Sequence, residues 1–134
     1  MPRASILEER TTQTMDNKQS DDPRIETYYS LQPFKFHHVE RLEIHQISPE
    51  EGYVTFLEMV LRHSDPADNR RLFLKFEGVL NLRITPPMRA PLYMTQLEIG
   101  SIRDRQWEGA NYSVKEVEDE AISFLCRYFT STVI

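Results

Sequence analysis

A period-two alternation between Arg71 and Ile84 constrains the fold of this chain more than any other feature. Successive side chains of a β-strand point to opposite faces of the sheet, so residues two apart share a face. Gly78 stands within the series, where a glycine is typical of a bend or bulge. The pattern predicts one long, curved strand whose even-numbered side chains line the interior: Leu72, Leu74, Phe76, Leu80, Leu82 and Ile84.

Similar short runs of aromatic and β-branched residues continue from residue 34 onward, separated by turns rich in Pro, Gly and Asp. Residues 36–45 also fit a helical spacing. The patterns predict a mainly β fold, with α+β as the alternative. About six antiparallel strands would form a curved sheet, a sandwich or a half-barrel. The predicted strands cover residues 39–47, 53–63, 71–84, 92–102, 112–117 and 121–129.

The N-terminal part has a different composition. All fourteen aromatic residues (seven Phe, six Tyr and one Trp) lie from Tyr28 onward. Residues 8–26 are so polar that burial cannot offset the entropy lost on ordering them. We therefore expect residues 1–30 to form a polar tail, flexible or loosely docked, and residues 31–134 to form one β-rich domain. A short helix over residues 4–10 is the alternative for the tail.

Charge and cysteine content limit the classes of partner and the compartment. The 134 residues carry 16 basic and 21 acidic side chains, a formal net charge of -5, which disfavours binding to nucleic-acid phosphates. The acidic surplus suits solubility or a basic partner. Cys126 is the one cysteine, so no internal disulfide forms, and the first residues lack the apolar run of a signal or membrane segment. We expect a cytoplasmic protein with no membrane contact.

The titratable residues do not predict a metal site or a catalytic centre. His37 and His38 are adjacent on a strand and point to opposite faces, while His37 and His45 are about 26 Å apart along it. Only a fold-back could unite them with His63. Cys126 falls in phase with apolar neighbours, which predicts an inert core thiol. We expect no cofactor and no metal, and the absence of nucleophile motifs favours a protein that is not an enzyme.

Several short motifs resemble those of small bacterial β-rich domains, some of which are proposed as immunity proteins that neutralise the toxins of competing bacteria. The similar segments are Phe36-His37-His38-Val39, Phe76–Leu82, Tyr112-Ser113-Val114 and Ile122–Cys126, within residues 34–129. His38 stands where these domains usually have an acidic residue. The resemblance implies a β-rich fold and a binding role, and it supplies no active site.

Trp107 is the strongest candidate for a partner contact. It lies in a polar loop, and Trp and Arg supply much of the binding energy at protein interfaces because they bury large areas and donate hydrogen bonds. The alternative is that Trp107 folds back as a plug over one end of the core. The candidate partner-binding residues are Trp107, Arg103, Arg105 and Glu108.

These observations favour a noncatalytic protein-interaction domain, with toxin neutralisation as the specific hypothesis. The alternative is a small-ligand-binding domain or an enzyme with a pocket in the concave face of the sheet, lined by His37, Tyr53 and Tyr112. A homodimer that uses a strand edge, Phe129 or the C-terminal Val133-Ile134 is a third hypothesis.

Overall fold

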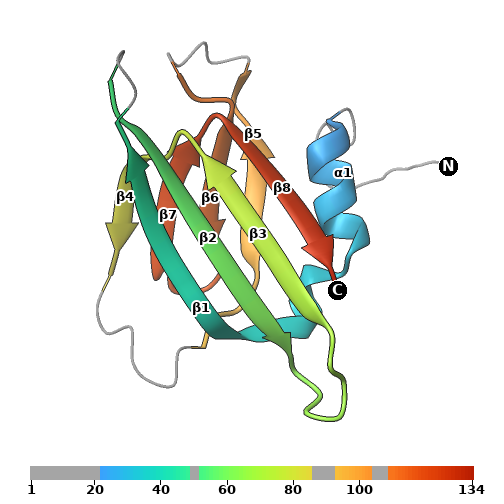
Figure 1. Cartoon of the computed structure of the whole chain (residues 1–134). Helices are drawn as coiled ribbons and strands as arrows, with labels where there is room; N and C mark the ends of the chain where they lie inside the picture. The colour runs from blue at the N-terminus through green and yellow to red at the C-terminus, as the bar shows by residue number, and fades with distance from the viewer. Residues whose placement is uncertain (1–21, 49–51, 86–92, 104–108) are drawn as a thin grey trace, which may run out of the picture.

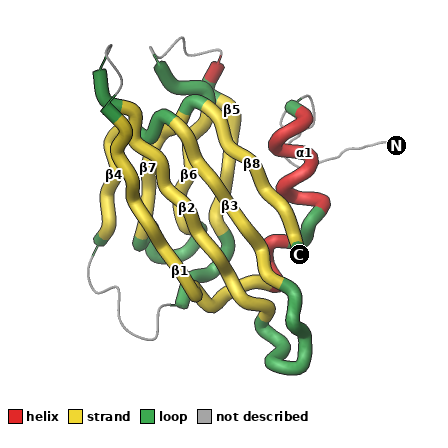
Figure 2. The backbone as a smooth tube through the Cα atoms, viewed as in Figure 1, coloured by secondary structure: helices red, strands yellow, loops and turns green. Residues whose placement is uncertain are grey.

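The computed structural model describes residues 22–48, 52–85, 93–103 and 109–134 of the chain (Figure 1). Within these ranges, two short helical elements come first and eight strands follow (Figure 2). The helical elements are α1 (Pro23–Ser30) and η2 (Pro33–Lys35). The strands are β1 (Phe36–Ile47), β2 (Val54–His63), β3 (Arg71–Glu77), β4 (Leu80–Ile84), β5 (Leu97–Ser101), β6 (Tyr112–Glu116), β7 (Ile122–Cys126) and β8 (Tyr128–Val133).

The strands form two antiparallel sheets that face each other (Figure 1). Sheet A has the order β1-β2-β3-β8, and sheet B has the order β4-β7-β6-β5. Side chains from both sheets belong to one buried cluster, so the architecture is a β-sandwich. The prediction of a mainly β, antiparallel fold is confirmed, and the sandwich is the one of the three predicted architectures that the chain adopts.

The alternation in β3 builds the centre of the core. Leu72, Leu74 and Phe76 are buried, as their even-numbered positions predicted. The ring of Phe76 lies 4.8 Å from that of Phe124 in the opposite sheet, in an edge-to-face arrangement, and 6.0 Å from that of Phe129. Aromatic pairs of this geometry add stability beyond the area they bury. The first half of the predicted strand therefore anchors one sheet on the other.

The second half of the predicted strand belongs to the other sheet, so the prediction of one continuous strand is wrong. Gly78 has φ +72°, a conformation that side chains disfavour, and a Cβ there would lie 3.0 Å from the Cβ of Arg127. The amides of Gly78 and Val79 both donate to the carbonyl of Thr55 at 3.0 Å. The chain turns here from sheet A into sheet B because β3 ends and β4 pairs with β7 instead.

The predicted interior face also changes within β4. Leu80 and Ile84 are each 42% exposed, so the expectation that both line the interior is wrong. Asn81 has φ +55°, and the register shifts within β4, which marks a bulge. Leu80 consequently pairs with Leu125 on the outer face of sheet B. Ile84 faces inward, but it lies on an edge strand that sheet A does not fully cover.

Three other predicted elements differ in detail. The helical alternative for residues 36–45 is wrong, because β1 covers them. The strand predicted from residue 92 begins at Leu97, and Tyr93 forms an isolated bridge with His38 instead. The last predicted strand divides at Arg127, where β7 of sheet B gives way to β8 of sheet A. The Arg127 amide donates to the carbonyl of Glu77 at 2.9 Å, so both sheet changes occur side by side.

Helix α1 covers the side of the sandwich between β8 and β5 (Figure 1). Asp22 caps the helix by accepting hydrogen bonds from the amides of the first turn, at 2.9 and 3.3 Å. Ile25 and Tyr28, three residues apart, share a face and are each 1% exposed. The Tyr28 hydroxyl donates to the carbonyl of Leu97 at 2.7 Å.

This helix lies within the range 1–30 that composition assigned to the tail, and the structure places residues 22–30 on the core instead. Two apolar side chains suffice to dock one face of an eight-residue helix. The mean polarity of the whole N-terminal segment does not reveal such a face. Residues 1–21, including the alternative helix over residues 4–10, lie outside the described residues. No helix in the described part of the chain is long and apolar enough for a membrane span.

Candidate functional site

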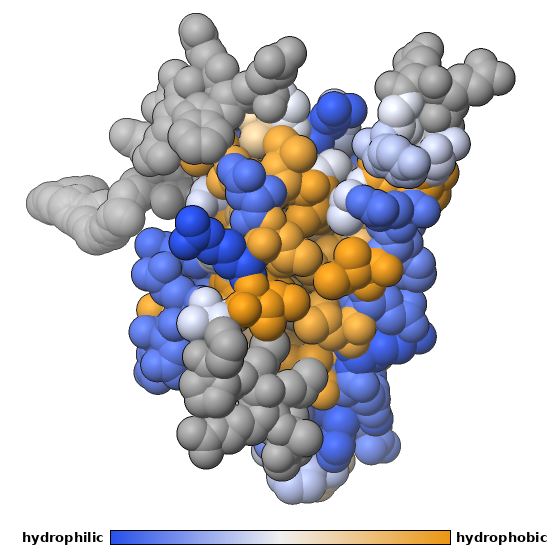
Figure 3. All heavy atoms as spheres, turned by 90° about the vertical axis from the view of Figure 1, so that its left-hand side faces the viewer, coloured by the Kyte–Doolittle hydropathy of each residue, from blue (hydrophilic) through white to orange (hydrophobic). Residues whose placement is uncertain are grey.

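Opposite α1, none of the described residues covers the side of the sandwich, and we call this side the open side. Edge strands β1 and β4 border it. Figure 3 shows an apolar band there between the polar outer faces of the two sheets. Uncovered apolar bands with polar borders are typical of protein interaction surfaces, and edge strands add unpaired backbone groups. The inward-facing side chains of these two strands that stay partly or half exposed are Val39, Leu42, Ile44, Leu82 and Ile84.

The outer face of β1 carries a compact charged group. Glu43 and Glu58 pair directly across β1 and β2, where like charges repel. Arg41 lies 3.5 Å from Glu43 and 3.8 Å from Glu58, and the Nε2 atom of His45 lies 3.2 and 3.7 Å from the same carboxylates. Arg41 therefore supplies the counter-charge of a carboxylate pair, with the imidazole of His45 beside it.

This group has the residue types of a metal site. One ligand atom from each of Glu43, His45 and Glu58 lies within 4.8 Å of the others, and imidazole with two carboxylates can bind a divalent cation. A cation would have to displace the guanidinium of Arg41 from both carboxylates. No sequence pattern indicated this group, because the two glutamates come from different strands and only the strand register brings them together.

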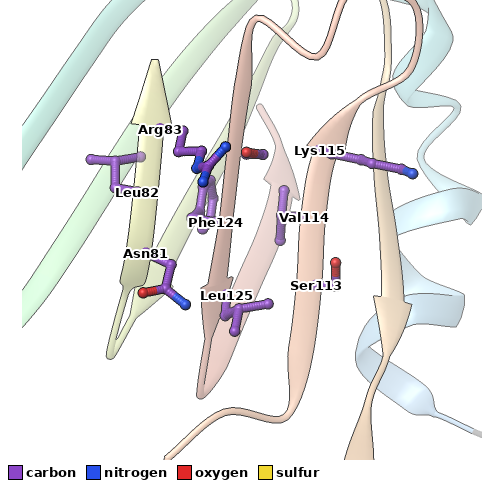
Figure 4. A pocket seen from close by; sticks show the side chains of 9 residues that line it. Asn81, Leu82, Arg83, Ser113, Val114, Lys115, Phe124 and Leu125 are labelled. Carbon is purple, nitrogen blue, oxygen red and sulfur yellow. The ribbon is translucent and has the colours of Figure 1, made fainter. Parts of the chain in front are cut away.

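A shallow trough of about 540 Å³ lies on the outer face of sheet B (Figure 4). The surface is hollowed there because two outward-facing residues of β6 and β7, Ser113 and Ser123, have small side chains. Arg83 reaches from β4 toward β7, and Lys115 projects from β6 toward β5 (Figure 4). We call this feature the trough; its outward-facing lining is Asn81, Arg83, Ser113, Lys115, Ser123 and Leu125.

The trough is basic, although the chain as a whole is acidic. It is lined by two cationic side chains and no carboxylate. Among the described residues, Arg83 makes no ion pair, and Lys115 has a single distant one, 3.8 Å from Glu98. Such an exposed pair contributes little to stability, so both cations are available to a partner.

The three residues proposed to line a concave pocket do not come together. Tyr112 is fully buried, and Tyr53 is 74% exposed at the start of the β2 segment. His37 lies at the opposite end of the β1–β2 hairpin, where its Nδ1 atom is 3.0 Å from the hydroxyl of Tyr93. The space between the sheets is filled by the core cluster.

Of the four proposed partner-binding residues, the structure describes Arg103; Trp107, Arg105 and Glu108 lie outside the described residues. The Arg103 guanidinium donates to the hydroxyl of Tyr112 at 2.8 Å and lies 3.4 Å from the carboxylate of Asp22. Its side chain remains 53% exposed. Arg103 thus ties the start of α1 to β6 and still presents charge to solvent beside the segment that carries Trp107.

Tyr112 and Asp22 form the buried part of this contact. The Tyr112 hydroxyl donates to Asp22 at 2.8 Å, and Asp22 is 5% exposed. Burial, together with this hydrogen bond and the charge of Asp22, raises the pKa of Tyr112 to about 12. The neutral phenol is therefore the form that the folded protein favours, as a structural hydrogen bond requires.

The lone cysteine occupies the interior, as its phase in the strand predicted. Cys126 has no exposed surface, and burial raises the pKa of its thiol to about 12. A thiol with a raised pKa is mostly protonated at neutral pH, and the thiolate is the nucleophilic form. Cys126 therefore contributes packing to the core.

Comparisons with known proteins place this chain in a family. Searches of curated proteins and of solved structures found no match. A family model described as immunity protein PIM8 matches residues 20–132, a range that includes α1, seven complete strands and nearly all of β8. The match agrees with the resemblance to immunity proteins noted in the sequence. The chain belongs to the immunity protein PIM8 family.

Proposed function

We propose that this chain is a noncatalytic immunity protein that neutralises a protein toxin by binding it. The observation that carries the proposal is the family match, which extends over residues 20–132. The cytoplasm is the proposed site of action, because a lone, buried thiol suits a reducing compartment.

The surface of the sandwich supports a protein partner. The open side exposes side chains such as Ile44 (49%) and Ile84 (42%) on the two edge strands β1 and β4. Apolar area of this kind, bordered by charge, is what a protein interface buries. Behind it, the filled core provides a rigid support.

The net negative charge of the chain should make the association rate with a basic toxin depend on salt concentration. A chain of net charge -5 attracts a basic toxin over the distance of a Debye length, which raises the association rate. We expect the association rate constant to fall by about tenfold between 50 and 500 mM NaCl, while dissociation changes less. Stopped-flow mixing measures both. An association rate that is independent of salt would contradict electrostatic capture.

The decisive experiment first asks whether a gene next to this one encodes a toxin domain, and then pairs the chain with that domain. Co-expression is expected to restore growth of cells that produce this toxin. With purified proteins, toxin activity should fall linearly and reach zero at about one equivalent, because a binder acts stoichiometrically. Inactivation by a small fraction of an equivalent would identify an enzyme instead. A metabolic neighbour and no rescue would overturn the proposal.

Trp107 remains the proposed contact in the segment that follows Arg103 in the sequence. We expect Trp107→Ala to weaken toxin binding at least tenfold, the scale of an interface hot spot, with a nearly unchanged melting temperature. Differential scanning calorimetry and calorimetric titration measure the two effects. If the ring plugs the core, the variant instead loses several kcal/mol of stability, the usual effect of removing a buried Trp.

A further inference from the structure

We propose that the trough on the outer face of sheet B receives a carboxylate side chain of the toxin, with Arg83 as the residue that binds it. This inference rests on the proposed function and adds to it the place of one contact and the chemistry of the partner at that point. It concerns a basic site on an acidic chain, so it does not follow from the overall charge.

Strand register builds the site. Arg83 pairs with Ser123, and Ser123 pairs with Lys115, so these three residues form one row across β4, β7 and β6. Neighbouring strands are about 4.8 Å apart, which places the backbones of the two cationic residues roughly 10 Å from each other with a small hydroxyl residue between them. A long side chain of a partner has room to enter this gap.

The donors of the row suit a carboxylate. The Arg83 guanidinium leans toward β7 and, among the described residues, has no ion pair (Figure 4). A guanidinium binds a carboxylate through two parallel hydrogen bonds, which are stronger than those between neutral groups. The hydroxyls of Ser113 and Ser123 supply further donors at the floor. Lys115, held only by its distant pair with Glu98, can turn toward the same anion.

The occupant is a side chain of a protein and not a nucleic-acid backbone, for reasons of charge and of neighbouring surface. A line of phosphates would meet the field of a chain with net charge -5 beyond this single site. The row beside the cations begins with two apolar residues, because Leu80, 42% exposed, pairs with Leu125, and Ser113 follows on β6. An acidic residue next to an apolar one complements both rows.

The trough is continuous with the open side through strand β4. Arg83 and Leu80 point to the outer face, whereas Ile84 pairs with the buried Ile122 and points toward the open side. A partner that covers the open side therefore meets the trough as soon as it extends around this one edge strand. This continuity selects the toxin of the proposed function as the occupant.

The experiment compares two charge reversals that alter the net charge equally. Arg83→Glu changes the trough, and Arg62→Glu changes an exposed residue on the outer face of sheet A. Titration calorimetry with the neighbouring toxin domain is expected to show about 30-fold weaker binding for Arg83→Glu and less than about threefold for Arg62→Glu. Lys115→Glu should fall between them. Thermal unfolding checks that each variant is folded. Arg83→Gln replaces Arg83→Glu if the latter does not fold.

A charge swap identifies the partner residue. Among Asp→Lys and Glu→Lys variants of the toxin surface, one is expected to bind the Arg83→Glu chain at least tenfold more tightly than the wild-type toxin does. Unchanged affinity for the double variant R83E/K115E would overturn the inference and leave the proposed function standing. Failure of the wild-type chain to bind or protect would overturn the proposed function itself. Trough-dependent binding of a labelled single-stranded oligonucleotide, without any effect on the toxin, would also overturn the inference.

Discussion

At the scale of single residues, Glu116 is a buried carboxylate that connects two turns. It is 2% exposed, and its two oxygens accept hydrogen bonds from the amide and hydroxyl of Thr95, at 3.1 and 3.3 Å, and from the amide of Ala121, at 2.9 Å. Glu116 is the last residue of β6, and charged side chains at strand ends are usually solvated. Its burial depends on two segments that only the folded chain brings to it.

We expect Glu116→Ala to lower the free energy of unfolding by about 2 kcal/mol, because the partly buried amides of Thr95 and Ala121 lose their acceptors. Urea denaturation measures the change. Glu118→Ala, at an exposed position of the same turn, is the matched control and should stay within about 0.5 kcal/mol of wild type. Equal effects of the two substitutions would contradict the role given to Glu116.

Tyr112 gives the stability a dependence on alkaline pH. Its pKa is raised to about 12 by burial and by Asp22, against about 10 in an unfolded chain. Between these values the unfolded state binds fewer protons, so stability is fully present below pH 10 and falls as the pH rises toward 12. The slope of the unfolding free energy against pH is set by the difference in bound protons between the two states. Tyr112→Phe should lower this difference by about one proton in this range.

Urea denaturation at a series of pH values between about 9 and 12 tests the contribution of Tyr112, and Tyr53→Phe is its control. The Tyr53 side chain is 74% exposed, so its hydroxyl is solvated in both states and the wild-type slope should persist. A wild-type slope for Tyr112→Phe as well would show that the Tyr112–Asp22 contact does not favour the neutral phenol.

At the scale of elements, the change of sheet after β3 depends on Gly78. Its φ of +72° disfavours a side chain, and so does the 3.0 Å that would separate a Cβ at this position from the Cβ of Arg127. We expect Gly78→Ala to destabilise the protein by about 1–2 kcal/mol through backbone strain and this close approach. Gly100→Ala is the control, because Gly100 has an ordinary backbone conformation and no atom within 4 Å of its Cβ position.

Calorimetry should show a lower melting temperature for Gly78→Ala and almost none of this change for Gly100→Ala. Similar loss in both variants would mean that Gly78 acts only through strand propensity. The sequence predicted a bend at this glycine, and the bend exists. It did not predict that the bend transfers the chain to another sheet, because that outcome depends on Arg127 and Thr55, which approach Gly78 only in the folded protein.

At the scale of the whole molecule, the described part of the packed unit starts with Asp22, the cap of α1. Deletion of residues 1–20 leaves Asp22 and the core contacts of Ile25 and Tyr28, so we expect the melting temperature to stay within about 2 °C. Deletion of residues 1–30 removes both core side chains and is expected to cost several kcal/mol, about the effect of two buried side chains. Thermal unfolding of the two truncated chains distinguishes a boundary near residue 21 from one at residue 30.

The sequence alone indicated most of the strand residues and, for β3 and β7, which side chains point inward, because side-chain direction alternates along any extended segment. Composition and a few motifs were enough to indicate a β-rich immunity-type domain. Only the tertiary structure decided which sheet each strand joins, that Ile25 and Tyr28 dock a helix, and that Arg83, Ser123 and Lys115 form one row. Those features depend on register and packing between segments far apart in the chain, and no local pattern encodes such neighbours.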